Sequence, residues 1–189
     1  MSIYWISWLF LLCLLGLALA YDITQRRIPN WLVLAGLVAG VGCSLLVQPA
    51  PGALTLPAGV SGPEQALLGA LAGLAIMAPL YFLRAMGAGD AKLMAAVGAF
   101  LGPIPILGTA LLTFVVGGVL SLVVALASGS LRRVLGNLRL ISLVAVYGRN
   151  SGISLRDVPT TGRLPYALAI AAGTGLQLWL AGQKGWPFP

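Results

Sequence analysis

Histidine is absent from this 189-residue chain, and acidic residues number only four. Without an imidazole the chain cannot build a Ser–His or Cys–His hydrolase or an HExxH zinc protease, because each of these needs histidine as a base or a ligand. The two cysteines, Cys13 and Cys43, lie in separate apolar runs and form no CxxC pair, so we expect buried bystander thiols. The sequence therefore predicts neither a metal nor another cofactor.

Charge is also scarce, since only 8% of the residues are charged and 59% are hydrophobic. A soluble domain carries roughly a quarter charged residues, and the mean hydropathy of +0.99 points to a membrane protein. A net charge of +7 would suggest nucleic acid in a soluble protein. Here the cations cluster in the segments between apolar runs, so we expect a lipid bilayer as partner and no nucleic acid.

Six apolar runs separated by polar or Pro- and Gly-rich segments predict an all-α polytopic membrane protein with about six transmembrane helices. We expect a single transmembrane domain over residues 1–189. The predicted spans are 3–21, 31–47, 66–83, 91–102, 106–127 and 164–181, with a large basic loop at 128–163. We expect the first run to be retained rather than cleaved as a signal peptide, because no Lys or Arg precedes it.

The distribution of cations predicts the orientation of the chain. Segments 22–30, 84–92 and 128–163 hold ten of the eleven Lys and Arg, whereas 48–65 and 102–105 hold none. The positive-inside rule places the three basic segments in the cytosol and both termini in the periplasm, which predicts a multi-pass protein of the bacterial inner membrane. Asp22 and Asp90 then fall on the same cytosolic membrane face.

These two aspartates are the candidate functional residues, because an ionisable side chain near membrane depth is costly. As a helix, span 91–102 would rise only about 18 Å, less than the roughly 30 Å hydrocarbon core. The turn before it is therefore expected at membrane depth, facing protein or a wet cavity. The structural alternative is that Asp22 marks a helix end beside Arg26 and that Asp90 caps the fourth span.

Two carboxylates a few ångströms apart share a proton, and they titrate as one unit that assigns neither residue as acid or base. The ionised member takes a proton from a water that attacks a carbonyl, while the protonated member polarises that carbonyl. Gly87 and Gly89 would let a substrate approach the turn closely and would allow positive φ. Lys92 would favour an ionised carboxylate, meet an acidic substrate side chain, or extend to the membrane interface.

Together these motifs resemble one family. Asp22-x5-Ile28-Pro29-Asn30 after a first span, followed by Gly87-Ala88-Gly89-Asp90-Ala91-Lys92-Leu93, resembles the prepilin peptidase family of GxGD intramembrane aspartyl proteases. The segment Leu164–Ala171 also resembles the last span of that family. The resemblance implies that Asp22 and Asp90 are catalytic and that Gly87 and Gly89 shape the active-site turn.

The same resemblance implies a substrate. It implies cleavage at the cytosolic membrane face of type IV prepilins or pseudopilins, which carry a leader followed by a hydrophobic N-terminal helix. Larger members of the family carry an insertion with paired CxxC motifs that is linked to N-methylation of the trimmed pilin. This chain has no CxxC and looks like the short form of tight-adherence (Flp) pilus systems, so we do not expect methyltransferase activity.

Two other functions are compatible with the same sequence. A small proton- or cation-coupled transporter would use both carboxylates and would show flux without cleaving a peptide bond. A non-catalytic assembly subunit of a secretion machine is a third hypothesis. The peptidase alone predicts that Asp22→Ala and Asp90→Ala each abolish prepilin shortening while the protein still inserts.

Overall fold

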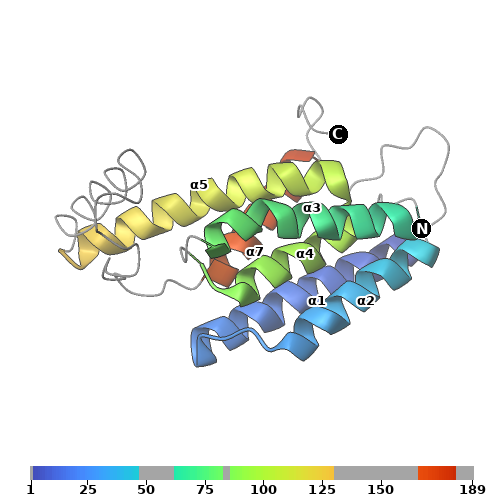
Figure 1. Cartoon of the computed structure of the whole chain (residues 1–189), viewed down its shortest axis with the longest axis horizontal. Coiled ribbons are helices and arrows are strands. Elements are labelled where there is room, and N and C mark those ends of the chain that lie inside the picture. The colour runs from blue at the N-terminus through green and yellow to red at the C-terminus, as the bar shows by residue number, and fades with distance from the viewer. Residues whose placement is uncertain (1, 47–61, 83–85, 130–165, 182–189) are drawn as a thin grey trace, which may run out of the picture. The chain divides into compact units, whose positions relative to one another are not determined.

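The computed structural model describes residues 2–46, 62–82, 86–129 and 166–181 (Figure 1). These residues form six α-helices and no strand, which confirms the predicted all-α class for this part of the chain. The helices are α1 (Ser2–Gln25), α2 (Asn30–Leu46), α3 (Pro63–Phe82), α4 (Ala88–Leu101), α5 (Pro103–Ala127) and α7 (Tyr166–Ala181).

Each helix overlaps one predicted span. α1 continues to Gln25, four residues beyond its predicted end, and several other ends differ because a proline or a glycine sets the boundary. α5 begins at Pro103 rather than at residue 106, because proline fits the first position of a helix. α4 ends at Leu101, and its C-cap residue Gly102 has a φ of 83°, which favours glycine, and donates its N–H to the Gly98 carbonyl at 2.8 Å. Most of the predicted loop 128–163 lies outside the described residues.

The chain divides into two compact units, Met1–Gly117 with Pro165–Pro189, and Gly118–Leu164. The described part of the second unit is the end of α5 and the turn that follows it. The first unit contains every predicted site residue. A single peptidase domain over residues 1–189 stays a prediction.

Three of the described helices are long and apolar enough to cross a membrane, namely Ile6–Gln25 within α1, α3 and α5. The apolar helices α2 and α7 are shorter. These features support a multi-pass membrane protein, while the side on which the termini lie stays a prediction. α4 has 14 residues and begins at Ala88 rather than at residue 91, so Asp90 lies within its first turn.

α4 is the most deeply buried of these helices, with nine of its 14 residues buried. It contacts α1, α2, α3 and α7. Many large apolar side chains on α1, α2 and α3 are instead exposed and form the kind of surface that a bilayer covers. The short α4 is therefore held by protein, and it carries Asp90 at its N-terminal end.

Glycines allow the backbones of α3 and α4 to touch. A Cβ on Gly69 would collide with the carbonyl oxygen of Gly98, and a Cβ on Gly98 would collide with that of Gly69. One turn further along α3, a Cβ on Gly73 would lie 2.5 Å from the Met94 carbonyl oxygen. Small residues at such spacing are the usual means of close helix packing in membranes. They fix the position of α4 against α3.

Candidate active site

Asp22 is buried because it continues the buried stripe of α1. Ser7, Leu11, Leu14 and Ala18 are buried at helical spacing, and Asp22 follows at the next turn with 9% of its surface exposed. The exposed side of the same helix carries Cys13, which corrects the prediction of two buried thiols because this residue lies off the stripe. A carboxylate in such a position needs polar partners.

The first turn of α7 supplies one such partner. The Ala167 N–H donates to Asp22 Oδ2 at 3.0 Å. Free N–H groups at a helix N-terminus favour an anionic acceptor. The alternative that Asp22 marks a helix end is wrong for its position, since α1 continues to Gln25 and the Arg26 N–H donates to the Asp22 carbonyl at 3.0 Å. The Asp22 side chain accepts its hydrogen bond from α7, at a residue 145 positions further along the chain.

Asp90 lies in the first turn of α4, where its half-buried carboxylate meets the preceding turn. The Gly87 N–H donates to Asp90 Oδ2 at 3.1 Å. Gly87 is the N-cap residue, so Asp90 occupies the third helical position and bonds back to the cap. Asp90 therefore does help to cap the start of α4, as the structural alternative predicted, but it does so from the third helical position and not as the N-cap residue.

The two predicted aspartates come together in the structure. Their helices, α1 and α4, are in contact, and the Asp22 and Asp90 carboxylates lie within range of each other's negative charge. Within the described ranges, each carboxylate has a single hydrogen bond, in both cases to Oδ2. The Oδ1 atoms have no such partner there. Two neighbouring carboxyl groups with unused oxygens can hold a water and exchange a proton.

The glycines of the turn provide room rather than unusual backbone angles. Gly87 has an extended backbone with φ of −79°, and Gly89 is part of α4, so neither residue uses the positive φ that glycine would allow. A Cβ on Gly87 would lie 3.2 Å from Asp90 Oδ2, and a Cβ on Gly89 would lie 3.2 Å from the Ile28 Cβ. The first glycine lets the carboxylate reach its N–H donor, and the second lets the α1–α2 connection pack on the turn.

Lys92 links the beginnings of α4 and α2. Its Nζ donates to Asn30 Oδ1 at 3.0 Å, and both side chains are exposed. The sequence predicted a partner for this ammonium on the substrate or on a carboxylate, but not this asparagine. Because the acceptor is a neutral amide, the positive charge of Lys92 is not neutralised by this partner.

α7 brings a residue that sequence reasoning did not assign to the site. Tyr166 is its first residue, is half-buried, and interacts electrostatically with Asp90. In the sequence, its segment stands out only for the family resemblance.

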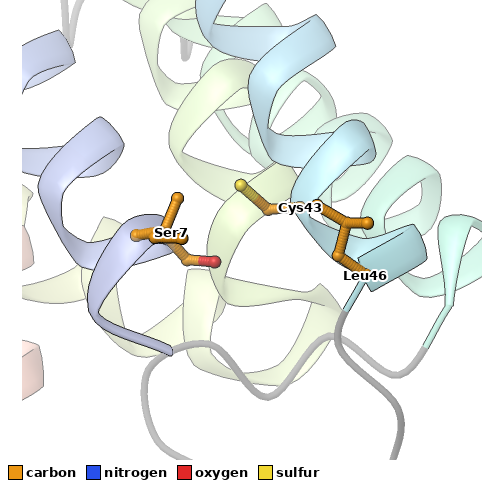
Figure 2. Close-up of a pocket in the computed structure, with 4 residues that line it drawn as sticks. Ser7, Cys43 and Leu46 are labelled. Atoms are coloured by element: carbon orange, nitrogen blue, oxygen red, sulfur yellow. The ribbon is translucent and has the colours of Figure 1, made fainter. Parts of the chain in front are cut away.

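A separate small pocket lies near the other end of α1. It is lined by Ile6, Ser7, Cys43 and Leu46, and Figure 2 shows it between α1 and α2. From Ser7 to Asp22 a helix rises about 22 Å, so the pocket is not part of the carboxylate site. In the described portion of the chain, no three His, Cys, Asp or Glu side chains gather as a metal site would require.

One family model matches the chain, that of the type IV leader peptidase family, over residues 9–122. The matched range contains Asp22, the Gly87–Asp90 turn and Lys92, and it ends before α7. Neither the curated proteins nor the solved structures include a match.

Proposed function

Since the chain belongs to the type IV leader peptidase family, we propose that it is an intramembrane aspartic endopeptidase that removes the leader from Flp-type prepilins or pseudopilins. Family membership supports a protease, and the placement of Asp22 and Asp90 on contacting helices, each within range of the other's charge, is the observation that carries the aspartyl chemistry. Both residues lie within the matched range. The absence of CxxC argues against an additional methyltransferase activity.

The proposed reaction uses the two carboxyl groups as one acid–base unit. The ionised carboxylate takes a proton from a bound water, whose oxygen attacks the scissile carbonyl carbon. The protonated carboxyl donates a hydrogen bond to the carbonyl oxygen and gives its proton to the leaving amine as the C–N bond breaks. One water is consumed, and the products are an amine and a carboxylic acid that then ionises in water. The dyad is again singly protonated, with the proton on the carboxyl that began the cycle ionised.

The proposed substrate is a leader followed by a hydrophobic helix, which fits a site built at the ends of apolar helices. The leader would lie at the Gly87–Asp90 turn, where small residues leave room for an extended backbone. The hydrophobic part of the substrate would lie in the bilayer against the exposed apolar surface of the helices. The positive charge of Lys92 would then meet acidic groups of the substrate.

Co-expression with a candidate Flp-type prepilin, in a host that lacks such a peptidase, tests this proposal. The prepilin is expected to become shorter on a gel only when the chain is present. A transporter would instead leave the prepilin at full length and would show flux that depends on the same carboxylates. Full-length prepilin beside well-inserted protein would contradict the proposal.

We further propose that the dyad faces the cytosol of a bacterium and that the protein lies in the inner membrane. The basic segments that support this orientation include the 128–163 loop, most of which is outside the described residues. A reporter active only in the cytosol is expected to work when fused at Ser151 of this loop. Activity there of a periplasmic reporter instead would overturn the orientation.

Replacement of Lys92 by methionine is expected to lower kcat/KM for prepilin cleavage about three- to tenfold, because both its hydrogen bond and its charge are lost. Asn30→Ala removes only the hydrogen-bond acceptor and is expected to have a smaller effect. The comparison uses purified protein in detergent with a single prepilin substrate. Unchanged kcat/KM for Lys92→Met would show that neither the charge nor the bond to Asn30 contributes.

A further inference from the structure

We propose that Tyr166 is a third catalytic residue, whose hydroxyl donates a hydrogen bond to the scissile carbonyl oxygen as that oxygen becomes anionic. The inference rests on the proposed peptidase function. It extends the site to α7, which lies outside the range matched by the family model. Tyr166 would act on the reacting oxygen directly while keeping its own proton.

The position of Tyr166 follows from the contacts of α7. The next residue, Ala167, donates its N–H to Asp22 Oδ2 at 3.0 Å, so the first turn of α7 begins at the carboxylate. α7 also contacts α1 and α4, the two helices that carry the dyad. The tyrosine is therefore at the same end of these helices as Asp22 and Asp90.

The aromatic ring is fixed by packing, and its hydroxyl is left without a protein partner in the described ranges. The ring packs against the buried core. A Cβ on Gly117 would lie 3.6 Å from Cε1 and 3.9 Å from Cζ of the ring, so the hydroxyl-bearing edge lies beside this residue of α5 at ordinary packing distance. Tyrosine hydroxyls in such half-buried settings usually have a hydrogen-bond partner. This hydroxyl lies within electrostatic range of Asp90.

The chemistry of the site leaves a role for such a donor. The dyad handles the protons, but the tetrahedral intermediate also places charge on the former carbonyl oxygen. Two backbone donors at the site, the N–H groups of Gly87 and Ala167, are already used by the two carboxylates. That oxygen has two lone pairs. One accepts a hydrogen bond from the protonated carboxyl, and the other accepts one from the Tyr166 hydroxyl.

Tyr166→Phe tests this role, because it removes the hydroxyl and keeps the ring that packs on Gly117. With purified protein and a prepilin, kcat is expected to fall about 100-fold, while KM stays within about twofold and the Tm is unchanged. The matched control is Tyr81→Phe on α3, whose side chain is exposed and packs beside Phe82. This control is expected to keep wild-type kcat.

Three results would overturn the inference. One is a kcat for Tyr166→Phe within twofold of wild type, and another is a higher KM with unchanged kcat, which would indicate substrate binding only. The third is a loss of kcat accompanied by a lower Tm, which would indicate a packing role. Failure of the wild-type protein to cleave any prepilin would instead refute the proposed peptidase function, and the role of Tyr166 with it.

Discussion

Asparagine in place of either Asp22 or Asp90 is expected to lower kcat/KM for prepilin cleavage by at least about 1,000-fold. The amide has the shape of the carboxylate but can neither take a proton from water nor share one with its neighbour. The two carboxylates lie within range of each other's charge, so in the proposed mechanism the loss of one also removes the proton-sharing partner of the other. The measurement is the cleavage rate of a prepilin by purified, reconstituted protein.

The same substitutions leave the helix contacts in place. Each asparagine keeps an oxygen that can accept the N–H of Ala167 or of Gly87, as Asp22 and Asp90 do. The variants are therefore expected to insert and to melt like the wild type. Glu64→Gln makes the matching change at an exposed acid in the first turn of α3 and is expected to be fully active. More than a tenth of wild-type activity in either asparagine variant would contradict the dyad.

The second large effect is expected where α3 and α4 touch. Gly69→Ala and Gly98→Ala each place a methyl group against a backbone carbonyl of the facing helix, which cannot move aside as a flexible side chain would. Overpacking of this kind costs about 1–3 kcal/mol or more, which corresponds to a Tm lower by roughly 3–10 °C. Because α4 carries Asp90, cleavage activity is expected to fall with the Tm.

The control for this prediction is the same substitution at a glycine with open space. Gly42 of α2 has no atom within 4 Å of the place where a Cβ would be. Gly42→Ala is therefore expected to leave the Tm unchanged or slightly higher, because alanine favours helix. Thermal unfolding in one detergent compares all three variants. Equal Tm values for Gly98→Ala and Gly42→Ala would show that the backbones of α3 and α4 are not in contact.

Much of this architecture was predictable from local sequence patterns. Apolar runs and their proline and glycine breaks indicate the helices to within a few residues, because both helix formation and membrane burial depend on nearby residues. The loop charges and the position of the GxGD turn also predict that Asp22 and Asp90 share one membrane face. The catalytic roles themselves stay predictions.

Other features depend on which helices meet, and no local pattern encodes that. The bond from Ala167 to Asp22 joins residues 145 positions apart, so neither neighbourhood in the sequence indicates it. The place of Tyr166 beside the dyad depends on the same packing. One signal for a helix contact is present in the sequence, since Gly69 and Gly73 are four residues apart on α3 and are typical of close packing.

The most direct test of the dyad is mass spectrometry of an Flp-type prepilin after incubation with the purified protein in liposomes. The prepilin is expected to lose only the mass of its leader and to gain one new N-terminal amine. No such product is expected with Asp22→Asn or Asp90→Asn. An intact prepilin after incubation with the wild-type protein, or the same product from either variant, would contradict the account.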